Sequence, residues 1–429
     1  MILRGFLSLF LVVFLSVSAY GKTQSESSEQ EIVESLKKQE EKIKELERII
    51  RELKVKIEEA EREDEMRKLL EEAQKLASRK KEDKAALDER KFYSGLRQHS
   101  VLNPNISVGG DYYYAYGTSG SEYNRVRSEI SWGTRQFFMR EMELAFEAAL
   151  DPYARAKVFL SAGGEGACVE EGYMKSLNWP LNMNLKLGMY RMQFGVINRY
   201  HTHALPQFER PLVMTNFFSN ETLKGIGVAA NFLLPSMTAH VNELDLEVVT
   251  GGADRSFTSE GKHNLIFGAH LKNYWDLSRS TYVEFGLSGA TGHNDPDETK
   301  RTDIYGADLR LKWSPPERSK YRGIEWWTEA LYSRRETPEG NINSWGFFSL
   351  VQCRLGARWL CGCRFDYSEL PYNNSLNEYG GAVNLDFWQS EFVFVRFQYT
   401  HIDRNFDEDD HRFIVQTVWA MGPHKHEAY

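Results

Sequence analysis

The segment Phe392-Val-Phe-Val-Arg-Phe-Gln-Tyr-Thr-His401 decides the fold class. From Val393 onward, apolar residues occupy every second position, and Arg396, Gln398 and Thr400 fall between them. Side chains alternate between the two faces of a β-strand, so one face of this segment is apolar and the other is polar. This period of two is typical of a strand that has lipid on one side and water on the other.

The same alternation recurs along residues 102–429. It is clear at 141–148, where glutamates alternate with apolar residues, and again at 182–190 and 243–248. Such runs predict about sixteen strands, an even number as single-chain bacterial barrels require. The strands are expected to begin near Asn105, Gln136, Ala154, Cys168, Asn182, Gly225, Glu243, Asn264, Thr281, Thr302, Gly323, Trp345, Trp359, Glu378, Phe392 and Arg412. The sequence therefore predicts an all-β transmembrane barrel of antiparallel strands.

The links between these runs support the barrel independently. When both ends of a barrel lie in the periplasm, links after even strands are short turns and links after odd strands are longer outside loops. The expected short links are 151–153, 178–181, 276–280, 355–358 and 389–390, and the expected long links are 116–135, 194–224, 251–263, 293–301, 335–342, 371–377 and 403–410. Two links are out of phase, because 162–166 is short for an outside loop and 314–322 is long for a turn.

The first 21 residues indicate export. Arg4 supplies a short positive region, Phe6 to Val17 is almost entirely apolar, and Ala19-Tyr20-Gly21 fits a small-x-small cleavage site. The apolar run is too short for a transmembrane helix, which needs about 20 apolar residues. We predict that residues 1–21 are a signal peptide and that the rest of the chain is exported.

Residues 22–101 have a different composition, rich in Glu, Lys, Arg, Leu and Ile, with no Gly or Pro from Lys22 to Tyr93. Apolar residues recur at spacings of three and four, at Ile32, Leu36, Ile43, Leu46, Ile50, Leu53, Ile57 and Ala60. This heptad pattern predicts a periplasmic α-helical coiled coil and linker before the barrel. A coiled coil implies a homo-oligomer, whose number stays open; a salt-bridged single helix is the alternative.

Composition excludes two classes of protein. After the signal segment no run of about 18 apolar residues occurs, which excludes a helical inner-membrane protein. The formal net charge of -8 argues against a nucleic-acid partner, since such partners require a basic face. The aromatic content of 13% suits a barrel, because barrels place aromatic rings at both membrane interfaces.

The four cysteines are too few for a disulfide scaffold. Cys353, Cys361 and Cys363 lie close together around a predicted turn, so an oxidising periplasm allows one bridge, from Cys353 to either of the other two. A Cys-Gly-Cys sequence without a second pair is a weak metal motif, and a structural role is the expected one.

The link from Phe194 to Lys224 is the longest in the predicted barrel. Links beyond about 15 residues are usually functional or disordered, and this one is rich in aromatic residues. We expect it to fold into the lumen and narrow it, because its aromatic rings would otherwise face water. The candidates for this constriction are Arg199, Tyr200, Phe208, Glu209 and Arg210. The alternative is that the loop packs on the outer rim or against a neighbouring protomer.

The alternation also predicts which charged side chains line the pore. The candidates are Glu143, Lys157, Lys186, Arg310, Glu329, Arg364 and Arg396. Acidic and basic residues are both abundant on the inferred inner face, and rings of one sign are what make a pore selective. The sequence therefore leaves the charge selectivity of the pore open.

The chain contains no nucleophile elbow, phosphate-binding loop or HExxH motif, so we expect neither an enzyme nor a cofactor. Two histidine pairs occur, His201-Thr-His203 on the long link and His424-Lys-His426 near the C-terminus. A metal site needs three or four converging ligands, which two local pairs do not establish. No metal is expected.

Several short segments resemble known porins. They are Leu102-Asn-Pro-Asn-Ile-Ser-Val-Gly-Gly-Asp111, Phe194-Gly195, Glu209-Arg210-Pro211 and the terminal Tyr429. With a signal peptide and a coiled coil before them, they are similar to bacterial outer-membrane porins related to the phosphate-selective porin family. The resemblance implies sixteen strands, a trimer, an inward constriction loop and passive diffusion of small solutes. Phosphate selectivity is not implied, since it needs a basic ladder, and Pro423 departs from the family's usual last strand.

The expected function is an outer-membrane porin for small hydrophilic solutes or ions. The alternative is a structural anchor whose coiled coil spans the periplasm, over about 80 Å for some 55 helical residues. Lipid of the outer membrane is the expected partner of the barrel, and peptidoglycan is a candidate partner of the exported chain.

Overall fold

The computed structural model describes residues 104–119, 136–163, 166–220, 222–236, 239–251, 255–258, 260–261 and 264–422, together with Lys42, Glu45, Arg48 and Ile49. The predicted signal peptide, the heptad pattern as a whole, His424, His426 and Tyr429 lie outside these residues and stay predictions. No helix in the described part of the chain is long and apolar enough to cross a membrane.

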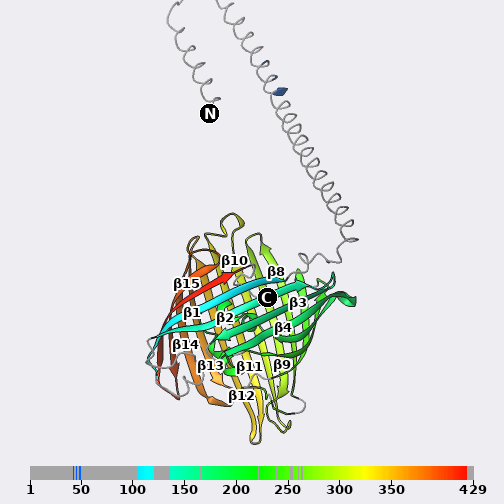
Figure 1. The fold of residues 1–429 in the computed structure, drawn as a ribbon, viewed down its shortest axis with the longest axis vertical. Helices are drawn as coiled ribbons and strands as arrows, with labels where there is room; N and C mark the ends of the chain where they lie inside the picture. The colour runs from blue at the N-terminus through cyan, green and yellow to red at the C-terminus, as the bar shows by residue number, and fades with distance from the viewer. Residues whose placement is uncertain are drawn as a thin grey trace, which may run out of the picture. The chain divides into compact units, whose positions relative to one another are not determined.

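Sixteen antiparallel strands form a closed barrel, in which each strand pairs with its neighbours in sequence and β1 pairs with β16 (Figure 1). The strands are β1 (Asn105–Gly117), β2 (Gln136–Ala149), β3 (Ala154–Gly163), β4 (Gly166–Trp179), β5 (Met183–Arg191), β6 (Lys224–Leu234), β7 (Val241–Thr250), β8 (Leu265–Ser278), β9 (Thr281–His293), β10 (Arg301–Trp313), β11 (Gly323–Thr337), β12 (Gly340–Arg354), β13 (Trp359–Leu370), β14 (Asn373–Trp388), β15 (Val393–Arg404) and β16 (Asp410–Met421). The fold predicted from the period of two is confirmed.

Two of the predicted long loops are wrong. β12 begins at Gly340 and β14 at Asn373, so residues 338–339 and 371–372 are the links where 335–342 and 371–377 were predicted. These two links lie at the end of the barrel where the long loops were predicted, which we call the loop end. Here β12 and β14 continue beyond their apolar outer positions into polar sequence. A strand that leaves the membrane no longer needs an apolar face, so the period of two ends before the strand does.

The two links that were out of phase are real irregularities of the barrel. β3 and β4 pair as far as Gly163 and Gly166, which makes their link short. The opposite end of the barrel, which we call the turn end, carries 314–322, with the short 3-10 helix η4 (Pro316–Arg318).

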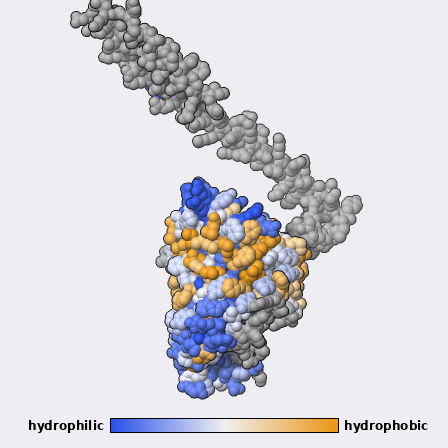
Figure 2. Space-filling model, turned by 90° about the vertical axis from the view of Figure 1, so that its left-hand side faces the viewer, coloured by the Kyte–Doolittle hydropathy of each residue, from blue (hydrophilic) through white to orange (hydrophobic). Residues whose placement is uncertain are grey.

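The outer surface of the barrel carries a belt of apolar side chains. Figure 2 shows hydrophobic residues gathered across the visible face, with hydrophilic residues toward both ends. Leu187 and Val228, for example, lie opposite each other on β5 and β6, and both are exposed. Aromatic rings mark the loop end of the belt, where Tyr305, Tyr332 and Trp345 lie opposite one another on β10, β11 and β12. This pattern matches the outer surface of transmembrane barrels.

All four cysteines are free thiols. The register places Cys353 of β12 opposite Cys361 of β13, so Cys361 rather than Cys363 is its cross-strand neighbour. No bridge joins them in this structure.

Candidate functional site in the barrel interior

The described residues between β5 and β6, 192–220 and 222–223, lie inside the barrel. It contains the 3-10 helices η2 (Ile197–Arg199) and η3 (Thr202–Ala204) and the short helix α5 (Leu212–Phe218). Every residue of α5 is buried, and the helix packs against β12 and β13. We call residues 192–223 the inner loop.

Acidic and polar side chains of the wall hold the backbone of the inner loop. Glu329 on β11 accepts hydrogen bonds from the N–H groups of Val196 and Ile197, at 2.7 and 2.6 Å. On the other side, Asp366 on β13 accepts from the Leu212 N–H at 3.2 Å. Further loop N–H groups donate to Glu141, Glu247, Ser288 and Gln398. Four carboxylates of the wall therefore satisfy buried donors of the inner loop.

Arginines of the wall hold the loop carbonyls. Arg364 donates to the Glu209 carbonyl at 2.6 Å, and Arg396 donates to the Leu205 carbonyl at 3.1 Å. Arg140 donates to the Phe208 carbonyl at 2.9 Å and its guanidinium lies 4.1 Å from the centre of the Phe208 ring. The loop is thus attached to the wall at its middle as well as at its ends.

Glycines on the inner face of four strands make room for the loop. A β-carbon at Gly306 would lie 2.9 Å from the Phe194 ring, and one at Gly380 would lie 2.9 Å from Leu212. Gly268 and Gly346 stand against Met192 and Val213 in the same way. Larger residues at these positions would push the loop away from the wall.

The five predicted constriction residues all lie on the inner loop, and they differ in what they contact. Arg210 donates to the carbonyls of Ile197 and Tyr200, so it holds the loop together. The Tyr200 ring packs against Trp327, 5.2 Å between centres, and Phe208 is buried under Arg140. Glu209 forms an ion pair with Arg412 of β16, and Arg199 lines a cavity near β7 and β8. Their role as a constriction stays a prediction.

The seven predicted pore-lining residues all face the interior, in two groups. Glu143, Glu329 and Arg364 are buried in contacts with the inner loop. Lys157, Lys186, Arg310 and Arg396 line the two larger cavities, although Arg396 also donates to the inner loop, and Arg364 lines the smallest cavity. Lys157 forms an ion pair with Glu147, Arg310 with Glu325 and Arg396 with Asp386. The charge of Lys186 interacts with those of Asp245 and Glu247.

Three cavities of about 640, 500 and 90 Å³ remain around the inner loop in the described part of the barrel. The two larger ones lie toward the turn end, and the smallest lies on the loop-end side of the inner loop. The described residues that line the 640 Å³ cavity include four basic and two acidic side chains. Those of the 500 Å³ cavity include six basic and three acidic side chains. Those of the 90 Å³ cavity include five basic and two acidic side chains. Among the described residues, each of these three cavities is lined by more basic than acidic side chains.

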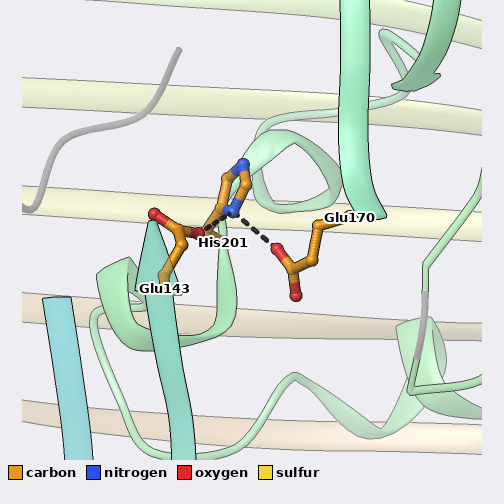
Figure 3. Close-up of side chains that lie close together, drawn as sticks. All are labelled: Glu143, Glu170 and His201. Carbon is orange, nitrogen blue, oxygen red and sulfur yellow. Dashed lines mark ion pairs between the residues drawn. The ribbon is translucent and has the colours of Figure 1, made fainter. Parts of the chain in front are cut away.

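The histidine pair of the inner loop lies against glutamates of β2 and β4. His201 Nδ1 is 2.8 Å from carboxylate oxygens of Glu143 and of Glu170 (Figure 3). Its Nε2 is 3.0 Å from Glu171. Burial and the Arg191 guanidinium lower the pKa of His201, but its hydrogen bonds to the three carboxylates outweigh both and raise the pKa to about 10.

Two β-bulges bring side chains into the interior that the sequence did not identify. The β3–β4 register shifts after Phe159, so Glu170 and Glu171, although consecutive, are both buried inside the barrel. The β1–β2 register shifts after Asp111, and Arg140 then faces the same side as Glu141. Bulges of this kind redirect a side chain, and a strict period of two cannot predict them.

A closed sixteen-stranded antiparallel barrel with a loop folded into its interior is the fold of outer-membrane porins. The anion-selective porin from Comamonas acidovorans matches with a TM-score of 0.51 at 9% identity, over 74% of this chain and 99% of that chain. The outer membrane channel DcaP of Acinetobacter baumannii matches with a TM-score of 0.50 at 12% identity, over 75% and 97%. OprB of Pseudomonas putida matches with a TM-score of 0.50 at 9% identity, over 75% and 94%.

In sequence, the chain is similar to an uncharacterised protein of Aquifex aeolicus (strain VF5). The two are 27% identical over 352 residues, which make up 72% of each chain. No protein-family model matches the chain.

Proposed function

We propose that this protein is an outer-membrane porin through which small hydrophilic solutes diffuse passively, and that the inner loop sets their size limit. The observation that carries the proposal is the charged inner wall with the inner loop tied across it, inside a barrel whose outer surface is apolar. Lipid suits the outer face and water suits the inner face. The mechanism needs no chemical step, because the charged wall replaces part of the water around the permeant.

Anions are the preferred permeants in this proposal. Some inward acids, such as Glu329 and Asp366, accept hydrogen bonds from the backbone of the inner loop and do not line the two larger cavities. Basic side chains outnumber acidic ones around all three cavities. An excess of one sign along a pore lowers the barrier for ions of the opposite sign. The Comamonas acidovorans barrel is named as anion-selective, which makes chloride the first ion to test.

Reversal potentials in planar bilayers test the proposal. Under a KCl gradient we expect stable open steps and a reversal potential of the sign that chloride selectivity gives. Replacement of Lys157, Lys186 and Lys272 by Gln, all on the 500 Å³ cavity, should move the potential toward cations. Arg279→Gln, in an exposed turn away from the cavities, is the control and should leave it unchanged.

Two results would contradict the proposal. A correctly folded barrel that shows no open steps would overturn the pore itself. A reversal potential of the opposite sign, unaffected by the triple replacement, would overturn the anion preference while the pore stood.

The alternative role as an envelope anchor rests on the heptad pattern of residues 22–101, as does the oligomer; the trimer rests on the resemblance. Deletion of residues 30–86 separates the two functions. Detachment of the outer membrane with unchanged permeability would favour the anchor, whereas altered permeability with an attached membrane would favour the pore.

A further inference from the structure

The pore proposal does not use the contact of His201 with the wall. His201 Nδ1 lies 2.8 Å from Glu143 Oε2 on β2 and 2.8 Å from Glu170 Oε2 on β4. All three side chains are buried, and their three ligand atoms lie within 4.8 Å of one another. Figure 3 shows both carboxylates directed at the same ring nitrogen.

The second ring nitrogen also faces a carboxylate. His201 Nε2 lies 3.0 Å from Glu171, whose other oxygen accepts the Arg191 N–H at 2.6 Å. A neutral imidazole has one N–H group and one bare nitrogen. Whichever nitrogen holds the proton, the other would direct its lone pair at a carboxylate. A further cation is therefore required at the ring, either a second proton or a metal ion.

The geometry at Nδ1 favours the metal ion. One N–H group points in one direction and serves one acceptor well, yet two carboxylates approach Nδ1 at the same distance. A metal ion between the three atoms would satisfy all of them. The contact of Nε2 with Glu171 is the arrangement that orients metal-bound histidines, in which the second ring nitrogen donates to an outer carboxylate.

We propose that Glu143, Glu170 and His201 bind a divalent transition-metal ion, with zinc as the best fit. Imidazole nitrogen and carboxylate oxygen are both zinc ligands, and a water molecule would complete a tetrahedral site with three protein ligands. Calcium does not fit, because it takes six to eight oxygen ligands. Zinc bonds of about 2.0–2.1 Å place tetrahedral ligands about 3.3 Å apart, so the carboxylates need to move outward by about 0.5 Å.

The surrounding charge also suits a divalent cation. Four buried glutamates surround the histidine pair: Glu141, Glu143, Glu170 and Glu171. Arg191 lies 3.4 Å from Glu170, and His203 lies 2.8 Å from Glu141. Arg191 and one divalent ion together would bring three positive charges to these four carboxylates. The ion would tie the inner loop to β2 and β4.

Metal analysis of the full-length protein tests the proposal. The starting protein is a background variant with His424→Ala and His426→Ala, which lacks the second histidine pair. It is purified from the membranes of cells grown with zinc. Mass spectrometry should find one zinc ion per chain, and X-ray absorption at the zinc edge should show one imidazole among oxygen ligands. Glu143→Gln combined with Glu170→Gln should lower the zinc content at least tenfold, as should His201→Ala.

Glu147→Gln is the matched control, since Glu147 lies on the same face of β2 but pairs with Lys157 at 3.3 Å. It should keep one zinc ion per chain. Circular dichroism and heat-modified gel migration establish that each variant is folded. If the folded background variant contains less than one zinc ion per chain, the further cation at the His201 ring is a proton. This result would overturn the proposal. Zinc that persists in the folded double-glutamine variant, or calcium in its place, would overturn it as well.

Discussion

The α-carbon of Gly195 lies against the carboxylate of Glu329, with no room between them for a methyl group. Gly195 has φ of 57°, in the left-handed region that residues with a β-carbon avoid. Its N–H donates to Ser288 at 2.9 Å, and the next two N–H groups donate to Glu329. The start of the inner loop is therefore fixed to β9 and β11 by contacts that require glycine.

Gly195→Ala should release this end of the inner loop. The left-handed conformation costs a non-glycine residue about 1 kcal/mol, and overlap with Glu329 adds to this cost. We expect larger and more variable single-channel conductance than in the unmodified protein. Gly289→Ala is the control, because a β-carbon there meets nothing within 4 Å. Identical conductance in the Gly195 variant would show that this contact does not position the loop.

Glu329→Ala should loosen the loop without a change in backbone strain. It removes the acceptor of two buried N–H groups, and each unsatisfied donor costs about 1–3 kcal/mol. A total of about 2 kcal/mol makes local opening about 30 times more frequent. Hydrogen exchange of a peptide that contains residues 196–197 should accelerate by about this factor.

Glu325→Ala is the control for that measurement. Glu325 lies on the same face of β11, but it pairs with Arg310 and Lys312 instead of the loop backbone. Exchange at residues 196–197 should stay slow in this variant. Equal acceleration in both would point to a general loosening of β11.

Asp386→Asn should lower stability and increase anion preference together. Arg396 contacts both oxygens of Asp386, at 3.0 Å each, and both side chains are buried. Loss of one partner of a buried pair costs about 3–5 kcal/mol, and we expect the lower end because Arg396 borders a cavity. Urea unfolding measures the first effect and the reversal potential measures the second.

The paired replacement Asp386→Leu with Arg396→Met is the matched control. It removes both charges, and replacement of a whole buried pair by apolar residues is often neutral. Stability should recover only in part, because the hydrogen bond from Arg396 to the Leu205 carbonyl is lost as well, while the added anion preference should disappear. If the single variant is as stable as the unmodified protein, water in the cavity already screens the pair.

Leu187→Arg should test the membrane position of the apolar belt. Leu187 is exposed on β5 beside the exposed Val228 of β6. A charge on the lipid face near the bilayer midplane costs about 2–4 kcal/mol. We expect this loss in urea unfolding from phospholipid vesicles. Tyr321→Arg, on the exposed link 314–322, should cost less than about 1 kcal/mol. Equal costs at the two positions would place β5 outside the hydrocarbon layer.

The sequence predicted the barrel well because the face of a strand to which a side chain points is a local property. In Phe392–His401, the parity of each position decides which face its side chain occupies, and β15 keeps that alternation with Phe397 exposed and Arg396 buried. The same reasoning failed at 335–342 and 371–377, where strands continue into polar sequence. Local pattern identifies the part of a strand in lipid better than the part beyond it.

The sequence did not identify the site around His201. Glu170 and Arg140 face inward because of bulges, and a bulge arises from the pairing of two strands rather than from the residues of one. Glu143 and Glu170 reach His201 only because the inner loop folds back against β2 and β4. The signal that remained in the sequence was Glu170-Glu171, two adjacent charges that break the alternation.

The sequence by itself determined a closed barrel with an apolar outer face and a charged inner face, because these depend on alternation and on link length. Only the tertiary structure decided which charges stay open to solvent. The backbone of the inner loop has donors that must be satisfied inside the barrel, and inward acids such as Glu329 satisfy them. Basic residues outnumber acidic ones around the cavities, and three glutamates lie around His201.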